Sequence, residues 1–345
     1  MARIVINKVC GMDLLTQGVL GAALAQAGSK QTETRLATGI GFAAGLLADA
    51  DALIRSANDS LLTIEYHRHF THSLFFIPFG ALIAAIILWP LLRKHIGFKR
   101  LYVFSLLGYS LSGFIDACTS YGTHLFWPLS DERVSFHLIS IVDPIFTIPL
   151  LIAVVLAYRW RRAKLAQLGL LFAAMYLAIG YVQMQRATSA MQTLALQRGH
   201  TPTQLIVKPT FGNILLWRSI YIENEKIVVD AIRMGVKKKV YAGESIQRVD
   251  VERDFSTLDK DSVLYQDMQR FSFFSAGYLA NHPSKPNALA DIRYSILPDG
   301  LEPLWGIEFD PTQPQKHAKF SVYRNLTKQN RQRFFSMLWG EALVK

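Results

Sequence analysis

The chain carries little charge and almost no cysteine. Charged residues make up 18% of its 345 residues, whereas an average soluble protein has about 25%. Cys10 and Cys118 are its two cysteines, too few for a disulfide scaffold or a cysteine-rich zinc module. No phosphate-binding loop or dinucleotide fingerprint occurs. Intrinsic disorder is also excluded, because 51% of the residues are hydrophobic and disordered chains lack such residues.

The shortage of charge is confined to the first half of the chain. Residues 1–185 contain 15 basic and 10 acidic residues, whereas residues 186–345 contain 22 and 16. The second half therefore has the charge density of an ordinary soluble domain. We predict an α-helical polytopic membrane domain over residues 1–185, followed by a soluble α+β domain, mostly antiparallel, over residues 186–345.

Uncharged runs in the first half predict about five to six membrane helices. Ser73–Leu92 is twenty residues without a charge, enough to cross about 30 Å of hydrocarbon as a helix. The other predicted spans are Leu14–Ala27, Leu36–Ala48, Leu101–Ile115, Leu138–Tyr158 and Leu165–Val182. The first two are rich in glycine and alanine, which lets helices approach closely. They are predicted to form a tight hairpin, with a buried or re-entrant segment as the alternative.

The basic loops predict the orientation of these helices. One loop holds Arg93, Lys94, Lys99 and Arg100, and another holds Arg159, Arg161, Arg162 and Lys164. Because basic loops remain in the cytoplasm, both are predicted to be cytoplasmic, together with Lys30 and Arg35. Arg3 and Lys8 at the N-terminus argue against this assignment. It places the C-terminal domain outside the cytoplasm, where nucleic acid is a poor partner.

The same assignment gathers acids and histidines on the outer face. The outer acids are Asp13, Asp49, Asp51, Asp59, Glu65, Asp116, Asp131, Glu132 and Asp143. The outer histidines are His67, His69, His72, His124 and His137. Carboxylate oxygen and imidazole nitrogen together suit zinc or manganese, and ionisable groups at membrane depth are usually functional. The pattern therefore predicts a divalent-metal site at one set of helix ends.

Five short motifs carry these groups, and each also has a plain structural explanation. Asp13 can cap a helix, Asp49 and Asp51 can end one in solvent, and Asp143-Pro144 is a common helix start. The His67–His72 run can be an interfacial polar patch, and Asp116 a turn residue. Cys118 is predicted to be buried and inert.

Spacing restricts how these side chains can meet. Asp49 and Asp51 can reach one ion only from a non-helical turn, and His67 is predicted to lie in a loop before His72. Thr71 and Ser73 are candidates for orienting the ligands. Arg68 stays protonated, so its predicted role is to hold a phosphate or carboxylate of a substrate.

At these motifs the sequence resembles the YdjM-like inner-membrane proteins, which are described as membrane-bound metal-dependent hydrolases. The resemblance covers residues 12–158. It rests on MDLLTQGVLGAALA (12–25), LLADADAL (46–53), HRHFTHSL (67–74), DACTSYGTHLFWPLSDER (116–133) and DPIFTIPLL (143–151). It implies a multi-helix protein of the inner membrane whose Asp and His residues bind a metal, with hydrolytic activity on an unknown substrate. From the donor types, zinc is the predicted ion and manganese the alternative. The implied ligands are Asp13, Asp49, Asp51, His67, His72, Asp116 and Asp143.

The chain departs from the family pattern at one position. A histidine is expected four residues before Asp116, and Ser112 stands there. His124 and His137 replace an expected glutamine and asparagine, so either is a candidate to compensate. The alternatives are a weakly bound metal or lost catalysis.

In the C-terminal domain, β-type runs and turns predict antiparallel strands. The predicted strands are Ile214–Ile222, Ile227–Met234, Val236–Tyr241, Arg293–Ile296 and Leu304–Phe309. Gln185–Pro209 is predicted to be a polar exit from the membrane, and Thr327–Leu343 a closing helix. Lys237, Lys238 and Lys239 are predicted to form a solvated turn or sheet edge, since no aromatic residues alternate with them for base stacking.

Three functions follow from these features. The leading hypothesis is a metal-dependent hydrolase at the outer membrane face, acting on a phosphoester or acyl bond of a lipid or lipid-linked substrate. Asp51 or Asp13 would be its general base, and Arg68 would hold the phosphate. The second is a non-enzymatic membrane protein with a structural Asp/His metal or polar cluster and a C-terminal interaction domain. The third, a cation transporter, is weaker because carriers bind near the bilayer midplane.

Overall fold

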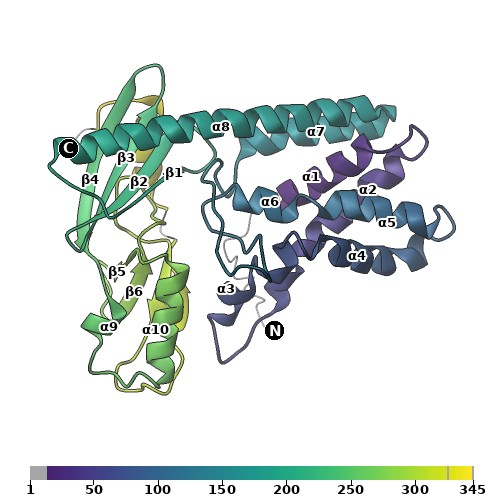
Figure 1. Ribbon diagram of the computed structural model, residues 1–345. Helices are drawn as coiled ribbons and strands as arrows, with labels where there is room; N and C mark the ends of the chain where they lie inside the picture. Colours follow the sequence, from purple (N-terminus) through teal and green to yellow (C-terminus); the bar gives the residue numbers. More distant parts are fainter. Residues whose placement is uncertain (1–13, 325, 344–345) are drawn as a thin grey trace. The chain divides into compact units, whose positions relative to one another are not determined.

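A computed structural model describes residues 14–324 and 326–343 of the chain. These residues divide into two units (Figure 1). The helical unit comprises the chain up to Ile54 together with Tyr66–Tyr181 and Phe211–Asn213. The sheet unit comprises Arg55–Glu65, Val182–Thr210 and the chain from Ile214 onward. The short segment Arg55–Glu65 thus belongs to the sheet unit although helical-unit sequence flanks it on both sides.

The helical unit is built from short apolar helices lying side by side (Figure 1). Its longer helices are α1 (Leu14–Ala27), α2 (Thr34–Leu47), α4 (Ile77–Leu92), α5 (Phe98–Tyr109), α7 (Pro144–Trp160) and the first part of α8 (Ala163–Gln197). Its shorter elements are η1 (Ala48–Leu53), η2 (Phe70–His72), α6 (Ser112–Ala117) and the last residue of α3 (Leu62–Tyr66).

Glycine allows α1, α2 and α5 to pack closely, as the hairpin prediction required. A Cβ atom on Gly21 would lie 2.5 Å from the carbonyl oxygen of Gly41 and 2.7 Å from that of Gly108. Any larger residue at this position would therefore push α1 away from its two neighbours. The packed backbones leave apolar side chains such as Ile86, Ile152 and Leu168 more than half exposed, a surface suited to lipid rather than water.

The predicted count of five to six membrane spans is not confirmed. Two described helices are long and apolar enough to cross a membrane: Thr34–Leu53, with 20 residues, and Ala163–Gln197, with 35. Leu62–His72 and Ile77–Leu92 would make a third if counted together, although they are bent by 94°. The shorter apolar helices α1 and α7 have 14 and 17 residues, or about 21 and 26 Å at 1.5 Å per residue. They fall short of the roughly 30 Å of a hydrocarbon core.

The loops that carry the basic residues meet at one end of the helical unit (Figure 1). Arg100 after α4 pairs with Glu33 in the α1–α2 loop at 2.8 Å. Arg35 donates from Nε to the carbonyl oxygen of Tyr158 at 3.3 Å, near the end of α7. The three loops predicted to share one side of the membrane therefore share one end of the fold.

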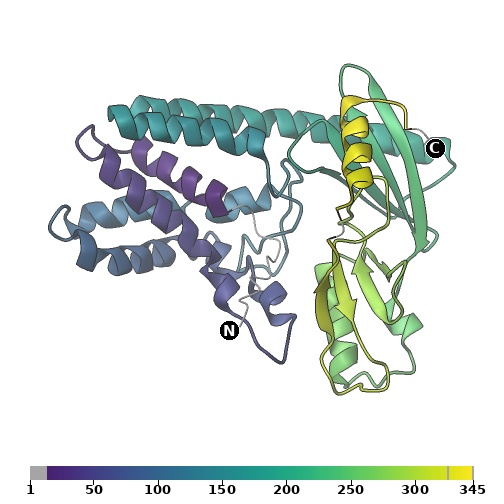
Figure 2. The same ribbon diagram turned by 180° about the vertical axis from the view of Figure 1, so that it is seen from behind.

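The sheet unit contains two antiparallel four-stranded sheets, visible from behind in Figure 2. The first has the order β1 (Gln204–Pro209), β2 (Leu216–Glu223), β3 (Lys226–Met234) and β4 (Lys238–Gln247). The second has the order β5 (Leu279–Asn281), β6 (Ala288–Asp291), β7 (Trp305–Glu308) and β8 (Lys319–Val322). The helices α9 (Val251–Asp254), α10 (Val263–Phe274) and α11 (Lys328–Trp339) complete the unit. The predicted antiparallel architecture is confirmed.

Several local predictions in this unit are confirmed and two are wrong. Asn224 and Glu225 both have positive φ in the β2–β3 turn, as a two-residue hairpin requires. Lys238 and Lys239 begin the edge strand β4, as predicted for a sheet edge. Residues 293–296 form no strand, apart from a single bridge at Ser295. Arg293 instead turns back to pair with Asp291 at 2.8 Å.

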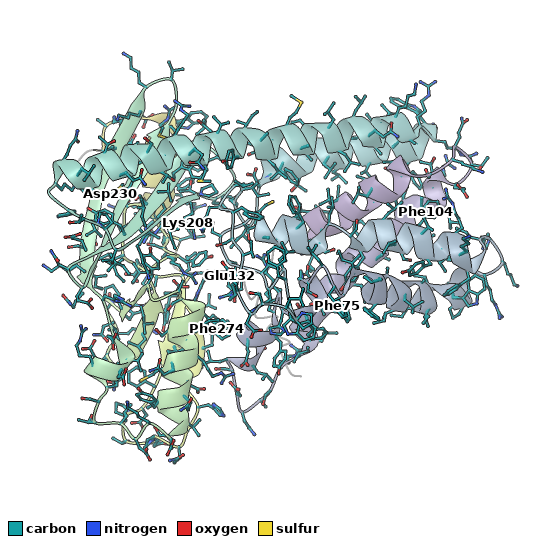
Figure 3. All side chains as sticks on the ribbon, in the orientation of Figure 1. Phe75, Phe104, Glu132, Lys208, Asp230 and Phe274 are labelled. Atoms are coloured by element: carbon teal, nitrogen blue, oxygen red, sulfur yellow. The ribbon has the colours of Figure 1, made fainter. Side chains whose placement is uncertain are left out.

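The predicted polar exit at Gln185–Pro209 is the other error, because α8 continues as a helix to Gln197. Three small or apolar residues spaced four apart, Ala187, Met191 and Ala195, are fully buried. Just past the helix end, Arg198 makes a two-pronged ion pair with Asp230 on β3, at 2.6 and 2.9 Å (Asp230 is labelled in Figure 3). Tertiary packing thus stabilises a segment that reads as a polar linker.

Side chains of the sheet unit also fix the segment Arg55–Glu65. Ser60 Oγ donates to the carbonyl oxygen of Ala318 at 2.9 Å. Arg270 on α10 pairs with Asp59 at 3.0 Å and with Glu65 at 2.6 Å. The chain between η1 and His67 is therefore an ordered segment held by a hydrogen bond and two ion pairs.

Candidate metal centre

Four segments bring acids and histidines together in the helical unit. The end of α2 tightens into the 3-10 helix η1, which carries Asp49 and Asp51. His67 lies in the turn after α3, as predicted, and His72 ends η2. Asp116 lies near the end of α6. Asp49, Asp51, His67, His72 and Asp116 form what we call the Asp/His cluster, and each is at most 8% exposed.

Asp51 is the hub of this cluster because its carboxylate accepts from several donors. His67 Nδ1 lies 2.9 Å from Oδ1. The backbone N–H of Arg68 and the hydroxyl of Thr71 donate to Oδ2 at 2.9 and 2.8 Å. Donation from Nδ1 of His67 to a carboxylate leaves the lone pair of that ring on Nε2, the tautomer that can bind a metal.

His72 lies between the carboxylates. Its Nδ1 is 3.2 Å from Asp51 Oδ2, while its Nε2 is 3.4 Å from Asp49 Oδ1 and 3.2 Å from Asp116 Oδ2. One ring nitrogen is thus held by Asp51, and the other faces two further carboxylates. This arrangement matches a metal-ligating histidine oriented by a carboxylate behind it.

Arg68 occupies a different position from the one its predicted role suggests. Its side chain is fully buried, and Nε lies 2.9 Å from Asp116 Oδ2. Nη1 donates to the hydroxyl of Thr119 at 2.8 Å and to the backbone oxygen of Asp116 at 3.3 Å. Within the described structure, the guanidinium therefore positions Asp116, and its role toward a substrate phosphate stays a prediction.

Unsatisfied polar atoms test whether the cluster fits a cation. Asp49 Oδ2, His67 Nε2 and Asp116 Oδ1 are buried without a hydrogen-bond partner among residues 14–324 and 326–343. Buried polar atoms normally have partners, and uncompensated charges are costly. Two sets, Asp49–Asp51–His67 and Asp49–His72–Asp116, each offer ligand atoms within 4.8 Å of one another. Carboxylate and imidazole donors at this spacing fit a divalent metal ion.

Two predicted ligands remain, one of which the structure describes. Asp13 lies outside the residues that the structure describes. Asp143 is the N-cap of α7: its Oδ1 accepts from the N–H groups of Ile145 and Phe146 at 3.1 and 3.2 Å. Its Oδ2 accepts from the hydroxyl of Tyr176 at 2.9 Å. With both oxygens engaged as in an ordinary helix start, a ligand role for Asp143 stays a prediction.

The departure at Ser112 is not repaired by a nearby histidine within the described residues. Ser112 Oγ is buried and donates to the backbone oxygen of Gly45 at 3.4 Å. His124 groups with His69 and Asp131 rather than with Asp116. His137 belongs to none of the metal-compatible groups found in the described part of the chain.

Sequence reasoning identified one orienting residue and missed two. Thr71 contacts both Asp51 and His72, as predicted, whereas Ser73 caps the following turn through the N–H of Phe76. Gln17 donates from Nε2 to Asp49 at 3.3 Å, and the Tyr109 hydroxyl donates to the backbone oxygen of Thr71 at 2.7 Å. Gln17 lies inside the first motif, so its polarity within an apolar run was the available signal.

Comparison with known proteins shows to which family the chain belongs. The model of the family described as YdjM inner membrane protein matches residues 12–187, half of the chain. The uncharacterized protein YfhP of Bacillus subtilis (strain 168) is 33% identical over 110 residues, which cover 32% of this chain. The chain thus spans about a third of the length of that relative, since 33% of it is matched. No solved structure matches. With its candidate membrane helices and its match over half of the sequence, the chain belongs to the YdjM inner membrane protein family.

Proposed function

We propose that this protein is a multi-pass enzyme of the inner membrane that hydrolyses its substrate with a divalent metal ion held by the Asp/His cluster. The observation that supports this most is the meeting of five ionisable side chains from four segments in a buried network. Among the described residues, Asp49 Oδ2, His67 Nε2 and Asp116 Oδ1 of this network have no hydrogen-bond partner. Ionisable groups that are costly to bury near a membrane are usually functional.

In this proposal the side chains divide into ligands and positioning residues. Asp49, His72 and Asp116 would hold the ion, because one carboxylate oxygen of each aspartate lies close to His72 Nε2. His67 adds a free Nε2 to the set. Asp51 would orient both histidines through their Nδ1 atoms, at 2.9 and 3.2 Å. Zinc is the ion we favour, with manganese as the alternative.

A bound divalent ion polarises the scissile group and acidifies a water molecule. A carboxylate must then accept the proton of that water, and its oxygen must be free to do so. Asp51 was predicted for this role together with Asp13, but its oxygens already accept from four donor groups. Asp49 Oδ2 has no partner in the described structure, so we assign the general base to Asp49 in preference to Asp51.

The proposed substrate is a lipid or lipid-linked molecule with a phosphoester or acyl bond. The basic loops meet at one end of the helical unit, whereas η1, η2 and the end of α6 carry the cluster at the other ends of their helices. Basic loops face the cytoplasm, so the proposal places the cluster at the outer face, at headgroup depth. The C-terminal domain would lie on the same side, with lipid rather than nucleic acid as its surroundings.

The test is metal content of the detergent-purified full chain, measured by mass spectrometry, in wild type and in His72→Ala. We expect His72→Ala to contain one bound ion fewer per chain. His95→Ala is the matched control, because His95 is exposed in the α4–α5 loop, and it should retain the wild-type content. Equal metal content in all three proteins would refute the ligand assignment. Hydrolysis of phospholipid or lipid-linked phosphoester in vesicles should be lost in His72→Ala alone.

A second function is favoured by the depth of burial. Asp51 and His72 are 2% exposed and Asp116 is fully buried, and Ser112 replaces an expected histidine. The cluster could therefore be a structural metal or polar lock that joins η1, η2 and α6, with the sheet unit as an interaction module. Metal binding that depends on His72, combined with unchanged hydrolysis in His72→Ala, would favour this function over the first.

A further inference from the structure

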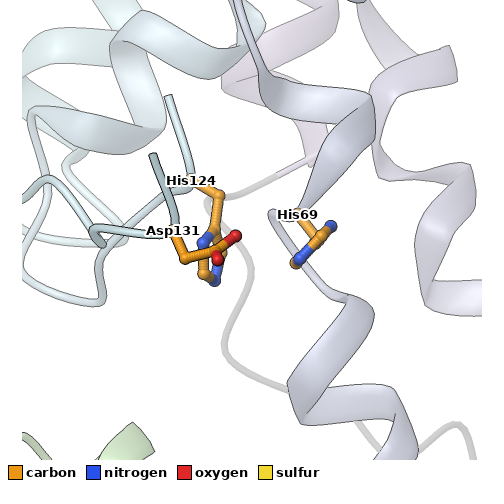
Figure 4. A group of neighbouring side chains, drawn as sticks. All are labelled: His69, His124 and Asp131. Carbon is orange, nitrogen blue, oxygen red and sulfur yellow. The ribbon is translucent and has the colours of Figure 1, made fainter. Parts of the chain in front are cut away.

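A second group of metal-compatible side chains lies outside the Asp/His cluster. His69 precedes η2, while His124 and Asp131 lie in the connection between α6 and α7. One nitrogen from each histidine and one oxygen from Asp131 lie within 4.8 Å of one another. Figure 4 shows the three side chains facing a common space, with His124 and Asp131 opposite His69. None of the three is a member of the first cluster.

The backbone holds the two segments together independently of any ion. The N–H of His124 donates to the carbonyl oxygen of Arg68 at 3.0 Å, directly beside His69. The N–H of Leu74 donates to the carbonyl oxygen of Leu125 at 3.0 Å on the other side of η2. The imidazole rings of His69 and His124 are consequently 4.5 Å apart between centroids. Trp127 packs 5.7 Å from the His69 ring, which restricts its movement.

The donor set is that of an open metal site. Two imidazoles and one carboxylate are the protein ligands of several sites in which zinc keeps a free coordination position. Burial decreases across the group, from His124 at 4% exposed, through the partly buried His69, to the exposed Asp131. An ion can therefore enter from the solvent side of Asp131 while the two histidines form the inner wall.

The three ligand atoms need to move only a short distance to reach the spacing found around a zinc ion. Ligand atoms around a tetrahedral zinc ion lie about 3.3 Å apart, given bond lengths near 2.0 Å. The group must therefore close by about 1.5 Å at most from the 4.8 Å limit that it satisfies. Asp131 is exposed, so rotation of its side chain can bring its oxygen closer to both histidines, while any closure between the two histidine nitrogens requires a small rotation of their rings.

We propose that His69, His124 and Asp131 form a second divalent-cation site, distinct from the Asp/His cluster and open to solvent. Its preferred ion is zinc, because imidazole nitrogens outnumber carboxylate oxygens in the set. His69 shares its turn with His67 and Arg68, so an ion here would also fix the turn that supplies the first cluster. The site is a property of this chain's geometry and does not depend on hydrolysis.

Zinc binding to the chelator-treated full chain in detergent tests the proposal by equilibrium dialysis. Asp131→Asn is the main variant, because an exposed side chain can be changed without unfolding the protein, and His124→Gln removes one inner ligand. We expect each to weaken one zinc-binding step at least about tenfold, the smallest loss seen when the surroundings of a metal are disturbed. His137→Asn, a histidine of the same connection, should bind zinc as wild type does.

Comparison with His72→Ala separates this proposal from the proposed function. If Asp131→Asn loses one zinc-binding step and His72→Ala loses a different one, the protein has two sites. The double variant His72→Ala, Asp131→Asn should then lose both. If Asp131→Asn and His124→Gln titrate like His137→Asn, the second site is refuted, whatever the outcome for His72→Ala. His69 and His124 are then a packed aromatic pair with an acid beside it.

Discussion

Gly113 on α6 is a position where one added methyl group should disturb the Asp/His cluster without changing a ligand side chain. A Cβ atom there would overlap the backbone carbonyl oxygen of His72. Neither partner can yield easily, because the obstacle is main chain rather than the end of a flexible side chain. In Gly113→Ala, α6 and η2 must therefore move apart, and these elements carry Asp116 and His72.

The magnitude follows from the packing. The new contact is far inside the 3.0 Å that Cβ atoms keep from other heavy atoms, and overpacking of this kind costs about 1–3 kcal/mol. The pair most affected is His72 Nε2 and Asp116 Oδ2, now 3.2 Å apart. A displaced ligand pair should weaken metal binding by at least about tenfold, as disturbed metal surroundings generally do.

Zinc titration and thermal unfolding of the purified full chain measure both effects. Gly39→Ala on α2 is the matched control, because no atom of the described residues lies within 4 Å of a Cβ added there. That substitution should stabilise the protein by about 0.5–1 kcal/mol and leave metal affinity unchanged. If Gly113→Ala binds zinc as tightly as Gly39→Ala does, the contact between α6 and η2 does not position the cluster, and the reasoning fails.

Two further substitutions test Asp143 as the cap of α7 and Asp59 as the partner of an ion pair. Asp143→Ala removes the N-cap of α7, so calorimetry should show a loss of about 1 kcal/mol with unchanged metal content; loss of an ion would instead make Asp143 a ligand. Asp59→Asn tests an ion pair in the sheet unit. Burial raises the pKa of Asp59, but the hydrogen bonds from Arg270 and from the N–H of Leu61, together with the nearby positive charge, outweigh it, so the pKa lies below its ordinary value. The pair should therefore stabilise the fold above about pH 4 and cease to do so as the pH falls through the lowered pKa. Thermal unfolding should show Asp59→Asn less stable than wild type at pH 7 by up to about 1 kcal/mol. A difference that is equally large at pH 3 would contradict this.

The helices of the first half were largely readable from sequence. Leu14–Ala27 was predicted with the bounds it has in the structure, because an apolar run between polar residues marks its own ends. The predicted number of these helices as membrane spans is not confirmed, since length decides whether an apolar helix crosses a bilayer. The continuation of α8 to Gln197 was missed because it depends on tertiary structure: Ala187 and Met191 are buried, and Arg198 just past the helix end pairs with Asp230 on β3.

In the candidate site, too, the sequence predicted part of the arrangement and the tertiary structure decided the rest. Motif chemistry selected Asp49, Asp51, His67, His72 and Asp116 as metal-ligand candidates, but it selected Asp143 equally well. An aspartate that caps a helix and one that faces a cation have the same local sequence. The partners of their oxygens distinguish them, and those partners, such as Tyr176 and His72, come from distant segments.

By itself the sequence determined the apolar helices, the basic loops and the antiparallel sheet-rich second half. These depend on composition and on periodicity between near neighbours, which a single chain displays directly. The tertiary structure alone decided that Arg68 is buried against Asp116 and that His124 faces His69 and Asp131. Arg68 and Asp116 are 48 residues apart in the sequence, and His69 and His124 are 55 apart. Such pairings depend on how distant segments pack, which a local sequence pattern does not show.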